Sequence, residues 1–571
     1  MTNSRPKVGI LPPMLSLTVL GLFTMATTPP APTMRDLIET YQADYGNLTR
    51  FYNQDLSDNR SRRLTALFEQ ELKELEKVDF AKLDRDAQVD YLLFKNKLKH
   101  SARQLELDAK DNAEIAPLIP FAQEIVTLFE DRQGMKPIDP QSAAKTLKAI
   151  DKEIAEAKKA AENGLKIDKT VANRAAMAVD DLGKTLKAWF RFFDGYDPLF
   201  SWWCREPNKT VAANLDAYAK VIREKLVGIK PDDKDTIIGH PIGRERLLED
   251  LQAEMIPYTP EELLEIAKRE YAWCEVEMKK AAKEMGFGDD WHKALEKVKE
   301  DHVGPGEQPK LIRELADEAV KFVKDQDLVT IPPLAEEIWR MDMMSPDRQK
   351  VSPFFLGGDT ILVSFPTDEM TQEQKLMSMR ANNKHFARAT VFHELIPGHH
   401  LQGFMEDRYR PYRQLFSTPF WTEGWALWME FQFWDRKFPK TPENKVGMLF
   451  WRMHRCVRIE FSLGFHLGKY TPQQCVDMLV EKVGHERSTA EGEVRRSFGG
   501  GYSPLYQAAY MLGALQFRSL AKECVGDGKM TYKQFHDAIL HENNIPVAMV
   551  RAILTNQKLS KTLKVDWRFA D

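Results

Sequence analysis

The stretch Val-Phe-His-Glu-Leu-Ile-Pro-Gly-His-His-Leu-Gln at residues 391–402 places a carboxylate beside one imidazole and two further imidazoles shortly downstream. Three of the 13 histidines in the 571-residue chain fall within this stretch. Its apolar residues predict a buried helix. Neutral imidazole is the commonest protein ligand for zinc, and an adjacent glutamate can deprotonate a metal-bound water. The stretch therefore predicts a transition-metal site, with His393 as a ligand and Glu394 as general base.

Proline at position 397 determines how the histidines can meet. On a straight helix His400 would lie about 10 Å and His399 about 9 Å along the axis from His393, whereas two ligand nitrogens must each come within ~2.0–2.1 Å of one ion. Pro397 cannot donate a backbone hydrogen bond and its ring clashes with the preceding turn, while Gly398 leaves room for the backbone to adjust. The helix is therefore expected to break here and to bring His399 or His400 back toward His393.

A second segment, Phe-Trp-Thr-Glu-Gly-Trp-Ala-Leu-Trp-Met-Glu at residues 420–430, carries two acids in an apolar helix. Buried carboxylates need partners. The histidine run is similar to the His-Glu-x-x-His signature of zinc peptidases, although proline replaces the second histidine. In the helical zinc peptidases that it resembles (thimet oligopeptidase, angiotensin-converting enzyme and carboxypeptidase Taq), the third ligand is a glutamate on the following helix. The resemblance implies Glu423 as third ligand and favours His399 over His400, and Glu430 on the same face is expected to orient a histidine.

A third segment, residues 497–513, places Tyr502, Tyr506 and Tyr510 at four-residue intervals, which is one face of a predicted helix. A phenol near a metal can donate to the oxyanion of a tetrahedral intermediate. The segment resembles the Gly-Gly-Tyr-x-x-x-Tyr pattern of the thimet oligopeptidase family, which implies transition-state stabilisation by tyrosine. That family has histidine where Ser497 stands, so the stabilisation must be arranged differently or is weaker. Packing of the three rings in the core is the alternative.

The C-terminal part of the chain resembles the bacterial domain-of-unknown-function family 885. The shared motifs are His-Glu-x-x-Pro-Gly-His-His-Leu-Gln at 393–402, Glu-Gly-Trp-Ala-Leu at 423–427 and Pro-x-x-Gln-Ala-x-Tyr-x-x-Gly at 504–513. The resemblance covers residues 350–560. The family is grouped with gluzincin-type metallopeptidases and is often described as secreted or lipoprotein, which implies a zinc-dependent hydrolase.

Three arginines in the same part of the chain have two possible uses. Arg455, Arg458 and Arg496 can each grip a carboxylate bidentately. They are expected to hold a substrate carboxylate or, as the favoured use, to pair with nearby acids of the chain, which are Glu460, Glu491 and Glu493.

The composition limits the partners and the compartment. Lys and Arg at 81 nearly balance Asp and Glu at 85, so no basic field attracts nucleic acid. Basic residues before an apolar stretch predict a signal peptide over residues 1–28, and hence a secreted or periplasmic protein; a disordered tail is the alternative. No later run of about 18 apolar residues follows, so no membrane association is expected after removal of the signal. The five scattered cysteines are expected to be buried free thiols.

Helical signals dominate the rest of the chain. Thr259 and Thr471 each precede a proline and stand three residues before Glu or Gln, which predicts capped helix starts. One helix is expected at residues 372–400, with an exposed face at its N-terminal part. One strand is expected at 360–365, either as an edge that aligns substrate or as part of a structural hairpin.

These signals predict a mainly α fold. We expect a two-lobed helical architecture like that of metallopeptidases, with a deep cleft and a small sheet at the edge of the active site. The predicted regions are the signal peptide at 1–28, an N-terminal helical region at 29–350 and a metal-site region at 351–571.

The predicted function is zinc-dependent hydrolysis of peptide bonds in oligopeptides, with Zn²⁺ held by His393, His399 and Glu423. Two alternatives stay open, because Pro397 and Ser497 depart from the patterns of known peptidases. One is a non-catalytic peptide- or ligand-binding protein on a degenerate scaffold, and the other is a metal-dependent hydrolase of a non-peptide amide. The same ligand atoms also accept cobalt, nickel or manganese. No Gly-rich phosphate loop or nucleophile-elbow serine appears, so no nucleotide cofactor is expected.

Overall fold

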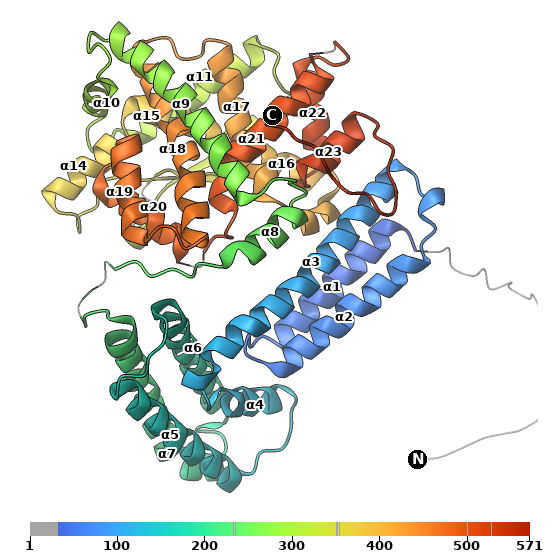
Figure 1. Cartoon of the computed structure of the whole chain (residues 1–571), viewed down its shortest axis with the longest axis vertical. Coiled ribbons are helices and arrows are strands. Elements are labelled where there is room, and N and C mark those ends of the chain that lie inside the picture. The colour runs from blue at the N-terminus through green and yellow to red at the C-terminus, as the bar shows by residue number, and fades with distance from the viewer. Residues whose placement is uncertain are drawn as a thin grey trace, which may run out of the picture.

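The computed structural model describes residues 32–231, 233, 236–349, 352, 354–499, 501–526 and 528–570. The signal peptide predicted for residues 1–28 lies outside them. Within the described part the fold is mainly helical, with 23 α-helices and one two-stranded sheet, which confirms the predicted fold class at this level (Figure 1). None of the helices described is long and apolar enough to cross a membrane.

Long helices make up the first part of the chain. α1, α2 and α3 pack side by side, and α4–α7 gather near the C-terminal end of α3 (Figure 1). The bounds are α1 (Met34–Phe51), α2 (Asp58–Lys77), η1 (Phe80–Lys82), α3 (Arg85–Ile115), η2 (Ala116–Leu118), α4 (Ala122–Gln133), α5 (Pro140–Glu162), α6 (Lys169–Phe193), α7 (Pro198–Val221), η3 (Ile222–Val227), α8 (Gly243–Ala253), α9 (Pro260–Glu284), α10 (Trp291–Lys299), α11 (Gln308–Asp325) and α12 (Pro333–Ile338).

The second part of the chain contains the sheet and the helices that carry the histidine and glutamate motifs. α17, α18 and α21 lie at its centre, and α18 also packs along α9. The bounds are β1 (Arg340–Met343), α13 (Pro346–Gln349), β2 (Thr360–Val363), α14 (Gln372–Ala381), α15 (Lys384–Glu394), α16 (His399–Arg408), η4 (Pro411–Phe416), α17 (Pro419–Asp435), α18 (Pro442–His466), α19 (Pro472–Val483), α20 (Arg487–Phe498), α21 (Tyr506–Cys524), α22 (Tyr532–His541) and α23 (Val547–Leu554).

Two large apolar clusters hold these helices together. One cluster lies among α4–α7 and the end of α3, and the other joins α1–α3 to the helices from α8 onward. The capping boxes predicted at Thr259 and Thr471 are both present, which confirms those helix starts. All five cysteines are buried and free, as predicted. The division predicted at residue 350 stays a prediction.

The sheet differs in part from the expectation. β2 lies within the predicted strand, but it pairs in parallel with β1, whose sequence Arg-Met-Asp-Met lacks the β-branched and aromatic residues that predict a strand. On the other side of β2, Leu362 forms an antiparallel bridge with Leu356. Both edges at the centre of β2 are therefore occupied, which leaves no free edge there for an added substrate strand.

The predicted helix at 372–400 is three helices, α14, α15 and α16. The break before α15 arises because the Asn383 side chain caps α15 by accepting hydrogen bonds from two backbone N–H groups. The expectation that Arg380 and Arg388 lie on an exposed face is also wrong. Arg380 forms ion pairs with three glutamates, and Arg388 is buried in an ion pair with Glu318.

A close contact between two helices sets the position of the glutamate motif. Gly424 of α17 faces Gly513 of α21, and a Cβ at Gly513 would lie 2.0 Å from the Phe420 carbonyl oxygen. Because neither position has room for a side chain, the two backbones can approach closely. This contact brings Glu423 of α17 beside Tyr506 at the start of α21.

Candidate metal centre

The helix carrying the histidines breaks at the predicted place. α15 ends at Glu394 and α16 begins at His399, and the Gly398 N–H donates to the Phe392 carbonyl, six residues back instead of four. A Cβ at Gly398 would lie 1.8 Å from the His393 carbonyl oxygen, so glycine is required for this wide turn. The Trp425 indole donates to the Pro397 carbonyl at 2.8 Å and thereby ties the turn to α17.

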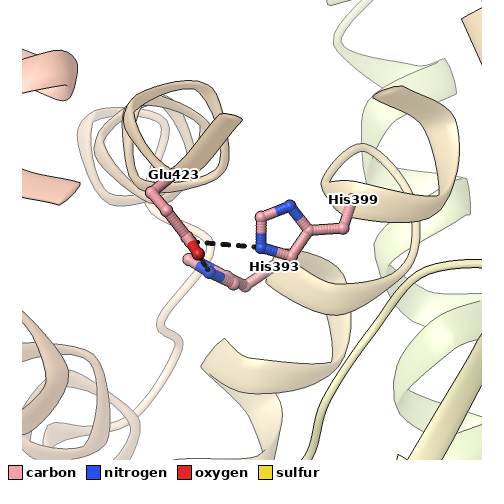
Figure 2. A group of neighbouring side chains, drawn as sticks. All are labelled: His393, His399 and Glu423. Atoms are coloured by element: carbon pink, nitrogen blue, oxygen red, sulfur yellow. Dashed lines mark ion pairs between the residues drawn. The ribbon is translucent and has the colours of Figure 1, made fainter. Parts of the chain in front are cut away.

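The wide turn places His393 and His399 against Glu423. The Glu423 Oε2 atom lies 3.5 Å from His393 Nε2 and 3.2 Å from His399 Nε2, and the three ligand atoms lie within 4.8 Å of one another (Figure 2). Oε2 is buried and has no hydrogen-bond partner. Ligand atoms around a tetrahedral zinc at ~2.0–2.1 Å are roughly 3.3–3.4 Å apart. Both oxygen–nitrogen distances are close to this value, so the three side chains suit a metal ion with nitrogen and oxygen ligands, such as zinc.

Hydrogen bonds orient both rings with Nε2 toward this centre. His393 Nδ1 lies 2.8 Å from Glu430 Oε1, so Glu430 makes the contact predicted for it. His399 Nδ1 lies 2.8 Å from Gln402 Oε1, and Gln402 donates through Nε2 to the Thr422 carbonyl at 3.0 Å. The amide is thereby fixed with its oxygen toward His399. Each Nδ1 is the donor in these contacts, and each Nε2 is left to bind a metal.

His400, the alternative ligand, lies outside the centre. Its Nε2 atom lies 2.7 Å from the Ala335 carbonyl oxygen, to which it donates, and the side chain is buried. The geometry therefore favours His399 as the second ligand, as the resemblance to the helical zinc peptidases implies. Gln402, which supports His399, was missing from the sequence reasoning; its position one turn after His399 is the signal that could have revealed it.

The charges of the cluster suit a cation. Burial alone lowers the pKa of His399, but the Glu423 carboxylate outweighs burial and raises that pKa to about 9. Burial alone raises the pKa of Glu423, but His399 and His393 hold that pKa well below its usual range. Glu423 is therefore ionised. The proton held by His399 supplies the positive charge that a divalent ion would bring. Metal binding must displace that proton.

Glu394 lies next to the ligands in a nearly closed environment. Its exposed fraction is 9%, and burial raises the pKa of its carboxyl group. A Cβ at Gly357 would lie 2.5 Å from Glu394 Oε2, so the segment before β2 passes directly over this carboxylate. A raised pKa brings a carboxylate nearer to the range in which a general base works at neutral pH.

The three tyrosines have different positions. Tyr506 donates through its hydroxyl to Glu423 Oε1, and the Tyr510 ring is stacked with the His393 ring at 6.2 Å between centroids. Tyr502 contacts the Tyr506 ring but lies before α21, so the prediction that all three share one helix is wrong. Pro504, which precedes α21, explains the difference, because a proline disfavours helical backbone at the residue before it.

A Glu430→Gln substitution tests the support of His393. Glutamine keeps the shape of the side chain and an acceptor oxygen but removes the charge that polarises the imidazole. We expect the affinity for Zn²⁺ to fall by about 10-fold, the lower end of the range for groups that support a metal ligand. Competition with a chromogenic chelator measures this affinity. An unchanged affinity would show that Glu430 has no part in metal binding.

The chain matches the model of one protein family. Residues 41–554 match the model of the family described as "Bacterial protein of unknown function (DUF885)". The match extends over most of the chain, and the chain therefore belongs to this family. A search of curated proteins gives no match.

Two solved structures share the fold. One is described as "a putative lipoprotein of unknown function from Shewanella oneidensis", with a TM-score of 0.67 and 17% identity over 92% of this chain and 100% of that one. The other is "the putative lipoprotein from Colwellia psychrerythraea", with a TM-score of 0.56 and 16% identity over 92% and 99% of the two chains. At this identity the likeness extends to the fold alone.

Proposed function

We propose that the protein, as a member of this family, is a zinc-dependent peptidase that hydrolyses oligopeptides outside the cytoplasm. One observation carries the proposal: Glu423 Oε2 is buried without a hydrogen bond and faces the Nε2 atoms of His393 and His399. A second acid, Glu394, lies beside them. A nitrogen and oxygen ligand set next to a buried carboxylate is the arrangement of a catalytic zinc site.

The side chains around the centre have separate tasks in this proposal. A zinc ion held by His393, His399 and Glu423 would supply a water of lowered pKa, near 7, and a positive charge for the scissile carbonyl. Glu394 accepts a proton from the attacking water and passes it to the departing amino group. Tyr506 holds Glu423 in place through its hydrogen bond.

Tyr510 is the better candidate for stabilising the oxyanion. Its ring lies against His393, and its hydroxyl makes no hydrogen bond with the described residues, whereas the Tyr506 hydroxyl is engaged with Glu423. Burial raises the pKa of Tyr510, so its phenol stays protonated at neutral pH and can donate. This role does not require the histidine that Ser497 replaces.

A cavity of about 380 Å³ has room for a short peptide, and its lining includes segments that adjoin the centre along the chain but none of the proposed ligands, Glu394 or the tyrosines. Its walls include α3 and α8 on one side, and on the other Ser417, just before α17, and Ser503–Leu505, just before α21. The helices α17 and α21 carry Glu423 and Tyr506. The volume falls in the range of ligand pockets. A cavity of this size suits short unfolded peptides better than folded proteins, which supports oligopeptides as the proposed substrates.

The extracytoplasmic location rests on two supports. The N-terminal sequence has the pattern of a signal peptide. Both solved structures that share the fold are described with the words "putative lipoprotein", which is consistent with such a location.

Incubation of the mature protein with a peptide library tests the function. With Zn²⁺ we expect cleavage products in the mass spectrum, which disappear after treatment with a chelator and return when zinc is added back. A library that stays intact while zinc is bound would support the non-catalytic alternative. Cleavage of small amides alone would support the non-peptide alternative.

A further inference from the structure

Arg455 is a buried cation without a hydrogen bond. It lies on α18 with an exposed fraction of 5%, and its Nε and Nη1 atoms have no partner. The four other buried arginines among the described residues each donate at least one hydrogen bond to a carboxylate; they are Arg388, Arg413, Arg452 and Arg458. Arginine cannot relieve this state by losing its proton.

The guanidinium of Arg455 lies beside the metal centre. Its Nη2 atom is 3.7 Å from Glu430 Oε1, which is the oxygen that accepts from His393. It also lies over the Tyr510 ring, at 5.2 Å from the centroid. Arg455 therefore lies beside the carboxylate that orients His393 and beside the proposed oxyanion donor.

The carboxylates nearest to the three arginines are already engaged with other partners. Glu493 pairs with Arg458 at 2.8 Å and with Arg496 at 3.2 Å, which is the structural pairing favoured from the sequence. Glu430 is shared between His393 and Arg455. Arg455 therefore has no carboxylate of its own within hydrogen-bond distance, and its Nε and Nη1 atoms are free to donate. Because buried polar groups without hydrogen bonds are costly, an acceptor from outside the chain would be favourable at these atoms.

We infer that Arg455 binds the terminal carboxylate of the substrate, so that the enzyme removes residues from the C-terminal end of peptides. The inference rests on the proposed function and specifies its substrate. Guanidinium is the side chain best suited to a carboxylate. Water attacks the carbonyl of the last peptide bond and the carbon–nitrogen bond breaks. The departing amino group takes a proton, which yields a shortened peptide and a free amino acid.

The test compares binding of free-acid and amide peptides in a protein that does not turn them over. Zinc-loaded Glu394→Gln protein is titrated calorimetrically with two matched pools of N-acetylated tetrapeptides, one with free C-termini and one with C-terminal amides. We expect the acids to bind about 10- to 100-fold more tightly, as for a hydrogen bond to a charged group. When Arg455→Met is combined with Glu394→Gln, we expect acids and amides to bind with equal affinity. Arg452 lies one turn away on α18 and pairs with Glu270. Combining Arg452→Met with Glu394→Gln should therefore preserve the tighter binding of the acids.

The outcomes distinguish carboxylate binding by Arg455 from the proposed peptidase activity. Equal binding of acids and amides to the Glu394→Gln protein would overturn the role of Arg455, as would discrimination that survives Arg455→Met. If the acids bind more tightly but the wild-type protein cleaves neither pool, carboxylate binding by Arg455 is supported and the proposed peptidase activity is wrong. If the wild-type protein cleaves acids and amides equally at internal bonds, the peptidase activity is supported and the role of Arg455 is wrong. Zinc content is measured in each variant, because Arg455 also contacts Glu430.

Discussion

Replacing Glu394 by glutamine is expected to lower kcat for peptide hydrolysis by about 10²- to 10⁴-fold, the usual contribution of a general base. Glutamine fills the same space beneath Gly357 but cannot accept a proton from water. Because the three proposed ligands are untouched, zinc content should stay at the wild-type level. The measurement is the initial rate on a peptide from the library, with zinc determined in the same samples.

A matched control is available in Glu71 on α2. This carboxyl group is also buried, and burial raises its pKa, but it lies among the N-terminal helices away from the metal centre. Glu71→Gln should leave kcat unchanged. If Glu394→Gln kept wild-type activity while zinc remained bound, the assignment of the base would be wrong.

Replacing Gly398 by alanine is expected to open the turn that joins the two histidines. The new Cβ would lie 1.8 Å from the His393 carbonyl oxygen and 2.5 Å from its carbon, which are backbone atoms that cannot move aside as a flexible side chain can. His399 would leave the centre. We expect the affinity for zinc to fall by at least about 100-fold, the upper end of the loss seen when only a supporting group is removed. Chelator competition measures the affinity.

Gly403→Ala provides the control for this substitution. Gly403 lies within α16, and a Cβ there would meet nothing within 4 Å. Alanine favours a helix interior over glycine by about 1 kcal/mol, so this variant should be slightly more stable and should bind zinc normally. Unchanged zinc affinity in Gly398→Ala would mean that the turn has no part in assembling the centre.

The sequence predicts the break in the histidine helix because the reason for it is local. Pro397 and Gly398 remove a hydrogen bond and a side chain at the same turn, and their effect does not depend on distant residues. The choice between His399 and His400 is not local. It depends on Gln402, fixed by a carbonyl of α17, and on the Ala335 carbonyl, which only the folded chain brings near.

Features that depend on tertiary contacts were harder to predict. β1 forms on a sequence without strand character because it pairs with β2. Arg388 has the charge of a surface residue but is buried because Glu318 of α11 lies opposite. The unmatched state of Arg455 appears only when each neighbouring carboxylate is assigned to its partner, which a linear sequence does not allow.

Elemental analysis of the purified mature protein, beside four single alanine variants, tests the metal centre most directly. The variants replace His393, His399, His400 and Glu423. We predict about one zinc per chain in the wild type and in His400→Ala, and loss of zinc in the other three, since a catalytic site has three protein ligands. Absence of zinc from the wild type after zinc is added back would contradict the account, as would retention by His399→Ala with loss from His400→Ala.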